Sequence, residues 1–276
     1  MTPLGVRARA VPGAVCARST GADRGAVNRW PVQAATAALL VALVLASGAA
    51  RTGLPDGLEI IEQSLRQQAP AADVFEEQVL VTSDPAGQAT VRTLRYYAHT
   101  DARGTQRLLV LDTPAILRGL RVLVTRAAHG GARRGPPAAS LVFGSNYTVA
   151  DLEGEQPPEQ DYALAADQTL ARVAHWVVLA TPRVSGGAEA GTRRIYLRKD
   201  NLYVSRVERL DATGAVVRRV TFKDPRPDES GAWRAGMTLI EDLREERRTL
   251  LKVEYRVHGA DYVPAALFQT PQGRGP

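Results

Sequence analysis

Hydrophobic positions near residue 60 recur with helical spacing. Leu58, Ile61 and Leu65 stand three and four residues apart within residues 54–70. This spacing places the three side chains on one face of a helix, and Pro70 favours a helix end at that point. The segment therefore predicts one amphipathic helix with a single buried stripe.

From Val74 onward the pattern changes to alternation with a period of two. Segments rich in Val, Leu, Tyr and Thr are separated by three similar turn sequences, DPAG at 84–87, DARG at 101–104 and DATG at 211–214. In each turn the Asp side chain can cap the backbone and the Gly accepts a left-handed conformation. Three copies of one turn chemistry predict an antiparallel meander.

The clearest strand lies at residues 249–257, where four apolar residues alternate with charged ones. Residues 171–182, ARVAHWVVLATP, are apolar on both faces, so either protein such as the first helix covers the second face or an apolar ligand does. Further strands are predicted at 193–198, 202–210, 215–223 and 237–243. The fold class is therefore mainly β with a few helices (α+β), built on a long, mostly antiparallel sheet.

Residues 141–152, LVFGSNYTVADL, predict a corner between a strand and a helix. The apolar run stops at Gly144, and Thr148 with Asp151 forms a capping box in which side chain and backbone satisfy each other at a helix start. The acidic, proline-rich residues 153–161 that follow predict a surface connection. The basic residues 131–137, GARRGPP, predict a solvated loop.

The first 49 residues have the composition of a secretory signal peptide. Five Arg precede an unbroken run of small apolar residues at 34–50. The run is short and alanine-rich for a membrane span, so export is favoured over a retained anchor. The basic leader is longer than is usual for a signal peptide, which suggests a translation start near Val27. The sole cysteine, Cys16, precedes the run, which argues against a lipid anchor on this protein. The predicted organisation is a leader at 1–49, a helix at 50–70 and a β domain at 71–276.

Charge and motif content exclude several function classes. The formal charge of +6 falls to about +2 after residue 49, and no basic stripe interleaved with aromatics suggests nucleic-acid binding. The four histidines lack metal-ligand spacing, so neither a metal nor another cofactor is predicted. Ser145 lacks the second glycine of a GxSxG elbow, so an esterase is disfavoured and no enzyme is predicted.

The chain from about residue 71 resembles the outer membrane lipoprotein-sorting family, the LolA-like proteins. The resemblance rests on LVFGSNYTVADL, on RRIYLRKDNLYVSRVERLDATGAVVRRV and on the closing YRVHGADYVPAALF. Asn146 departs from the family pattern, which has Asp there. The matching positions are Gly144, Ser145, Asp151, Leu152, Tyr196, Asp211, Gly214 and Phe268.

This resemblance implies a curved, incomplete barrel over helices with an apolar concave face. It also implies an exported, non-enzymatic periplasmic carrier that binds lipid acyl chains or lipoproteins. The alternative is a protein-interaction module that serves an inner-membrane transporter. From alternation and size, the candidate ligand contacts on one sheet face are Leu94, Tyr96, Val122, Val124, Trp176 and Val178.

Overall fold

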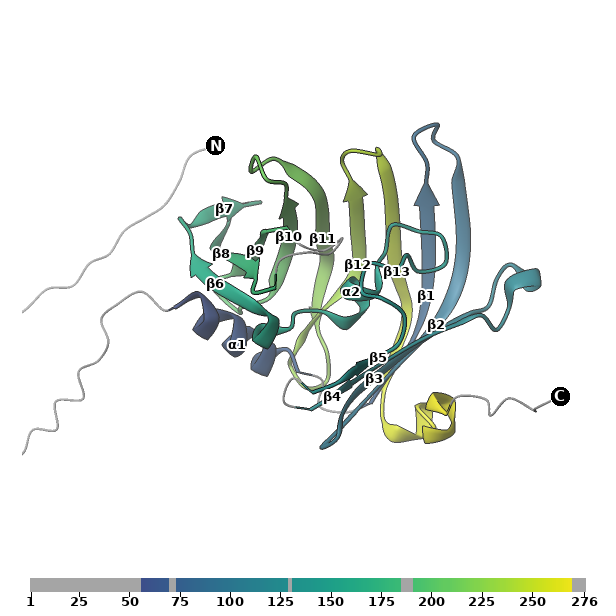
Figure 1. Cartoon of the computed structure of the whole chain (residues 1–276). Helices are drawn as coiled ribbons and strands as arrows, with labels where there is room; N and C mark the ends of the chain where they lie inside the picture. The colour runs from purple at the N-terminus through teal and green to yellow at the C-terminus, as the bar shows by residue number, and fades with distance from the viewer. Residues whose placement is uncertain (1–55, 70–72, 129–130, 185–190, 270–276) are drawn as a thin grey trace, which may run out of the picture. The chain divides into compact units, whose positions relative to one another are not determined.

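The computed structural model describes residues 56–69, 73–128, 131–184 and 191–269. Within these residues the chain forms one curved antiparallel sheet and two α-helices, α1 (Gly57–Gln67) and α2 (Val149–Glu153) (Figure 1). The predicted signal peptide lies outside the described residues. Among the described helices, none is long and apolar enough to cross a membrane.

In the described part of the chain the sheet contains thirteen strands. They are β1 (Val74–Ser83), β2 (Ala89–Asp101), β3 (Gly104–Leu111), β4 (Arg121–Ala127), β5 (Arg133–Arg134), β6 (Gln160–Leu164), β7 (Gln168–Leu170), β8 (Val173–Pro182), β9 (Arg193–Arg198), β10 (Val204–Leu210), β11 (Val216–Pro227), β12 (Trp233–Asp242) and β13 (Arg247–His258).

Two meanders make up this sheet. The order is β5-β4-β3-β2-β1-β13-β12-β11-β10-β9-β8-β6, with β7 paired to β8. One meander runs from β1 to β5 and the other from β8 to β13, and β1 joins them by pairing with β13, so that Val74 lies opposite His258. The three predicted turns close hairpins in these meanders, and Gly87, Gly104 and Gly214 have positive φ values of 80°, 141° and 84°. The predicted fold class, an open and mainly antiparallel β sheet with few helices, is confirmed.

Helix α1 confirms the predicted helix, but of the predicted buried stripe only Ile61 is fully buried. Its buried residues are Gly57, Ile60, Ile61 and Ser64, whereas Leu65 is 37% exposed. Small residues decide the orientation, because a side chain at Gly57 would meet the backbone of β6 at 3.1 Å. Hydrophobic spacing alone could not foresee that Gly57 and Ser64 join the isoleucines on the buried face.

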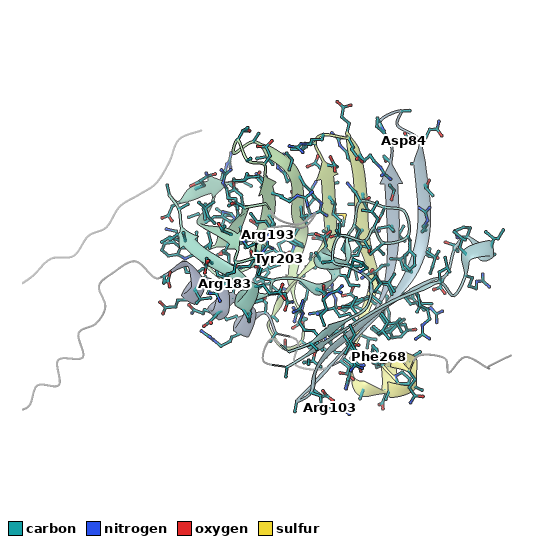
Figure 2. The ribbon with its side chains drawn as sticks, in the orientation of Figure 1. Asp84, Arg103, Arg183, Arg193, Tyr203 and Phe268 are labelled. Atoms are coloured by element: carbon teal, nitrogen blue, oxygen red, sulfur yellow. The ribbon has the colours of Figure 1, made fainter. Side chains whose placement is uncertain are left out.

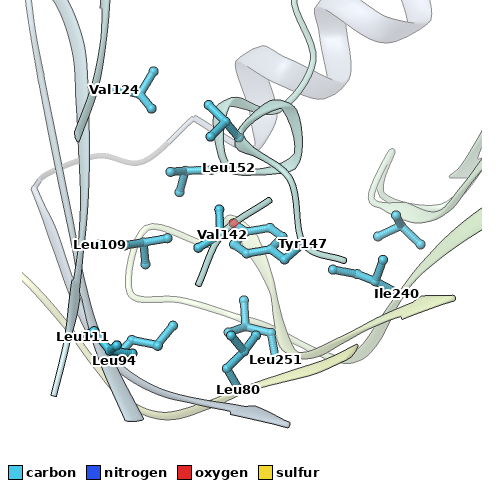
Figure 3. Packing of buried hydrophobic residues seen from close by; sticks show 12 residues of the cluster. Leu80, Leu94, Leu109, Leu111, Val124, Val142, Tyr147, Leu152, Ile240 and Leu251 are labelled. Atoms are coloured by element: carbon cyan, nitrogen blue, oxygen red, sulfur yellow. The ribbon is translucent and has the colours of Figure 1, made fainter. Parts of the chain in front are cut away.

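The inner face of β8 packs against α1. Val178 and Ala180 form a buried cluster with Ile60 and Ile61, and Trp176 packs against this cluster. Of the two alternatives for the apolar second face of this strand, the structure therefore supports cover by protein. The largest cluster lies further along the sheet, where Tyr147 and Leu152 extend toward Leu80, Leu109 and Leu251 (Figure 3).

The end of the described chain covers the outer face of β2 and β3. The short helices η3 (Ala260–Tyr262) and η4 (Ala265–Phe268) bring Val263 and Phe268 against Tyr97 and Leu108. Figure 2 labels Phe268. Tyr97 and Leu108 alternate with Tyr96 and Leu109, which belong to the inner-face cluster, so the two clusters lie on opposite sides of the sheet.

The corner at residues 141–152 differs from the prediction in its first half. Residues 141–143 form no regular strand, only a single bridge between Leu141 and Thr148. Phe143 and Gly144 have φ values of 50° and 72°, and two successive left-handed residues turn the chain too sharply for a strand. The second half is confirmed, because Thr148 and Asp151 form both bonds of a capping box at the start of α2.

Candidate functional site

A cavity of about 420 Å³ lies between the inner face of the sheet and the segment formed by residues 149–159. We call this segment the strap. It contains α2 and the short helix η2 (Pro157–Glu159). Helix α1 contributes Ile61, Ser64 and Leu65 to the same lining, which explains why the apolar Leu65 remains partly exposed.

The cavity has an apolar floor on the sheet. Six apolar side chains from β9, β10, β11 and β13 form it. They are Ile195, Val204, Val207, Val220, Phe222 and Leu251. Tyr147 closes one side, and burial raises the pKa of its hydroxyl well above the ordinary value, so the group stays neutral.

Arginines from four strands hold the carboxylates of the strap. Arg133 of β5 donates through Nε to both oxygens of Glu153 at 2.9 and 2.8 Å, and Arg126 of β4 approaches Glu153 at 3.5 Å and Glu159 at 2.7 Å. The Glu153 side chain is only 3% exposed, so its charge is balanced by these two guanidinium groups rather than by water.

The middle of the strap is held from β9. Arg193 makes two parallel hydrogen bonds of 2.8 Å to Glu155, a fork geometry that is strong for arginine and carboxylate. Tyr162 donates to the same carboxylate at 2.5 Å. Burial, followed by the charge of Glu155, raises the pKa of Tyr162, so this hydroxyl remains a donor.

Arg218 of β11 fixes the start of the strap. It donates to Asp151 Oδ1 at 3.0 Å and to the carbonyl of Asn146 at 3.0 Å. Asn146 is itself buried and donates to the carbonyls of Ile240 at 3.4 Å and Arg247 at 3.2 Å. The corner is thereby bonded to β11, β12 and β13 at once.

Two predicted surface segments are therefore wrong in part. Residues 153–161 carry the buried Glu153, and the expected solvated loop at 131–137 contains β5, whose Arg133 holds that carboxylate. Each segment is polar in sequence, and the partners of its charged residues stand elsewhere in the chain. Opposite charges that meet across the fold give a neutral, largely buried contact.

The candidate ligand contacts chosen from alternation lie in core clusters. Leu94 and Val124 are buried in the largest cluster, with Tyr96 and Val122 packed against it. Val178 is buried beside α1, where Trp176 packs. The structure does not bring these six residues together, and none of them belongs to the lining of the cavity described above.

The positions shared with the lipoprotein-sorting signature have structural roles. Ser145 is fully buried and donates its hydroxyl to the carbonyl of Val142 at 2.6 Å, so it shapes the corner. Leu152 is in the largest cluster, and Tyr196 donates to Glu208 at 2.9 Å. Asp211 and Gly214 form the turn between β10 and β11, and Phe268 covers the outer face. Asp151 alone among the eight lines the cavity.

Two carboxylates lie close to His99. Its Nδ1 is 2.8 Å from Asp73, and its Nε2 is 3.7 Å from Asp101. The strand pairing explains the contact with Asp73, which precedes β1 next to β2. Within the described residues no group of three or more His, Cys, Asp or Glu is placed to hold a metal ion.

Sequence reasoning missed the arginines that line the cavity. Arg133, Arg193 and Arg218 are separated from their carboxylates by 20, 38 and 67 residues. The available signal was weak: an arginine placed on the inner side of a strand by alternation requires a buried partner. In β11, Arg218 and Val220 share a face, which marks Arg218 as inward-facing once the register is known.

Comparison with solved structures identifies the fold. A candidate outer membrane lipoprotein-sorting protein domain from Vibrio parahaemolyticus matches with a TM-score of 0.67 and 16% identity, over 77% of this chain and 98% of that one. A DUF1329 family protein from Desulfovibrio piger matches with a TM-score of 0.66 and 17% identity over 77% and 98%. A LolA superfamily protein from Nitrosomonas europaea matches with a TM-score of 0.60 and 12% identity over 79% and 99%.

Sequence comparison adds a family. No curated protein matches the sequence. A family model described as "Uncharacterized protein" matches residues 135–272, which is half of the chain and includes the corner, the strap and every strand from β6 to β13. The chain therefore has the LolA-like fold and belongs to the family that this model defines.

Proposed function

We propose that this protein is an extracytoplasmic, non-enzymatic carrier that binds an acyl chain of a lipid or lipoprotein between the sheet and the strap. The cavity is the observation that carries the proposal. Its volume of about 420 Å³ falls within the range of small-molecule sites, about 300–1,000 Å³. Export by residues 1–49 and residence in the periplasm belong to the same proposal.

The lining suits an amphipathic ligand. The floor formed by Val204, Val207 and Phe222 offers apolar contacts, while the charged groups of the strap and its arginines gather at the other side. An acyl chain on this floor would leave water, and its polar end would remain near groups that can hydrogen-bond. We place ligand contact on this floor, with Leu94 and Trp176 supporting the surrounding core.

The energetics allow reversible binding. About fourteen methylenes at roughly 0.8 kcal/mol each give about 11 kcal/mol of gross gain on leaving water. An association cost at the lower end of the general range, about 4 kcal/mol, leaves a net gain of about 7 kcal/mol. A net gain of this size allows a ligand to be taken up and later released, which a carrier requires.

Uptake of cis-parinaric acid, a fluorescent fatty acid, tests the proposal. The protein is purified without detergent, and probe emission is titrated for the wild type, Val207→Glu and Val91→Glu. Val207 lines the cavity, whereas Val91 is 59% exposed, so the same change is made inside and outside the site. We expect the wild type and Val91→Glu to bind alike and Val207→Glu to bind at least about tenfold more weakly, because a carboxylate on the floor must be desolvated.

Mass spectrometry of organic extracts from the same preparations identifies a co-purified lipid. Absence of lipid together with no probe uptake by the wild type would overturn the carrier proposal and favour the protein-interaction module. Equal binding by Val207→Glu and the wild type would overturn the assignment of the cavity.

A further inference from the structure

Three arginines stand side by side on the inner face of the sheet, beside the floor of the cavity. Arg209 of β10 lies opposite Arg193 of β9 on one side and opposite Arg218 of β11 on the other. All three line the cavity, and Figure 2 labels Arg193. Residues directly opposite each other on antiparallel strands have Cβ atoms about 4.5–5.5 Å apart, so these side chains start as immediate neighbours. We call the three residues the arginine row.

An apolar row runs parallel to the arginine row. Val207 of β10 pairs with Ile195 of β9 and with Val220 of β11. These three side chains belong to the cavity floor. A step of two residues along a strand covers about 6–7 Å and keeps the side chain on the same face. The sheet therefore presents a charged row and an apolar row next to each other in one cavity.

The lining of the cavity contains more arginines than carboxylates. Among the described residues that line it, five are Arg and four are Asp or Glu. Two arginines and two carboxylates form the contacts of β4 and β5 with the strap. The remaining carboxylates are Asp151 and Glu155, which Arg218 and Arg193 bind. The arginine row therefore brings one positive charge in excess, whichever carboxylate each of its members contacts.

The arginine row is not sealed inside the protein. The Arg193 side chain is 23% exposed and Arg209 is partly exposed, whereas the Arg218 side chain is 10% exposed. Like charges directly opposite each other on neighbouring strands repel. An anion that approaches this row from the cavity would offset the repulsion and would accept charge-assisted hydrogen bonds, which a neutral group forms only in weaker form.

We infer that the cavity selects amphiphiles whose head carries a negative charge, with the head at the arginine row and the acyl chain on the apolar row. This inference rests on the proposed carrier function and specifies the class of lipid. Carboxylates and phosphates both present oxygen atoms that a guanidinium binds through two parallel hydrogen bonds. The shared chemistry is therefore an anionic oxygen head, which neither an ester nor a cationic amphiphile offers.

Binding of cis-parinaric acid and of its methyl ester to the full chain tests the inference. The two probes share one fluorescent acyl chain, and at about pH 8 only the acid is charged. We expect the wild type to bind the acid about tenfold more tightly than the ester, as a hydrogen bond to a charged group provides. The measured quantity is the ratio of the two dissociation constants, which a general loss of folded protein leaves unchanged.

Three variants test whether the preference comes from the arginine row. Arg209→Met should lower the ratio to about one and leave the affinity for the ester unchanged, because the excess charge is removed. Arg209→Lys keeps the charge and should keep most of the preference. Arg219→Met is the matched control, since Arg219 follows Arg218 on β11, faces the other side of the sheet and contacts Glu208 at 3.0 Å. Its ratio should equal that of the wild type.

Displacement of the bound ester distinguishes the possible heads. Laurate, dodecyl phosphate and dodecyltrimethylammonium carry a carboxylate, a phosphate and a cation on chains of similar length, and each is added below its micelle concentration. We expect the anions to displace the ester at lower concentrations than the cation does. The more effective anion identifies the head that the cavity prefers.

The outcomes separate this inference from the carrier proposal. Equal binding of acid and ester by the wild type would overturn the anionic head and leave the carrier proposal standing, whereas uptake of neither probe would overturn both. A wild-type ratio in Arg209→Met, or an equal decrease in Arg219→Met, would overturn the role of the arginine row. Displacement by the cation at concentrations as low as those of the anions would overturn the selection by charge.

Discussion

Replacement of Glu153 by Gln tests whether the ion pairs of the strap stabilise the fold. Glu153 is nearly inaccessible to water and accepts two hydrogen bonds from Arg133 while lying 3.5 Å from Arg126. Gln has almost the same shape but no charge, and only one of its two terminal atoms accepts hydrogen bonds. The change therefore removes the charge with little change in packing.

The expected loss of stability can be worked out from this geometry. Removal of one partner of a buried ion pair costs about 3–5 kcal/mol. The side chains of Arg126 and Arg133 are 14% and 22% exposed to solvent, so water can partly solvate them after the change. We therefore expect a decrease in the free energy of unfolding at the lower end, about 3 kcal/mol.

Urea denaturation followed by circular dichroism measures this loss. With a slope of about 2–3 kcal/mol per molar for a protein of this size, the midpoint should fall by about 1 M. Glu241→Gln is the matched control, because its partner Arg248 is 70% exposed at 3.6 Å and such a pair contributes at most about 1 kcal/mol. A Glu153→Gln midpoint no lower than that of Glu241→Gln would refute the reasoning.

Two further predictions concern buried polar groups. Asn146→Asp should lower the free energy of unfolding by about 2 kcal/mol, because a carboxylate would face the carbonyls that the amide now satisfies; an unchanged urea midpoint would contradict this. Burial lowers the pKa of His175 below 6.5, so the unfolded chain binds a proton that the folded chain resists, and stability should decline as pH falls below about 6.5. Urea midpoints at several pH values should decline less in His175→Gln, and an equal decline would exclude His175 as the cause.

The sequence was sufficient for features that depend on neighbouring residues. The turns at Gly87, Gly104 and Gly214 and the capping box of Thr148 and Asp151 were predicted because the groups that interact stand within a few positions of each other. Alternation then gave most of the strands and, with them, the class of fold.

Features that depend on distant residues were not predictable in the same way. Hydrophobic spacing predicts a buried Leu65, but the position of α1 on the sheet depends on Gly57, which admits the backbone of β6. The cavity floor combines β9, β10, β11 and β13, so its members are known only when the strand order is known. The six residues chosen from alternation are large apolar strand residues, and alternation cannot separate a cavity wall from a packed core.

The pairing of β1 with β13 has a consequence for how the chain acquires its structure. Val74 and His258 lie at opposite ends of the described β region, so the contacts that join the two meanders close a very long loop. Such distant pairing slows folding, because chain entropy is lost before the contacts form. Until β13 is in place, the facing edges of β1 and β12 expose unpaired backbone groups that can recruit other chains. A chain that ends before Arg247, and so lacks β13, should therefore aggregate rather than form a smaller folded sheet.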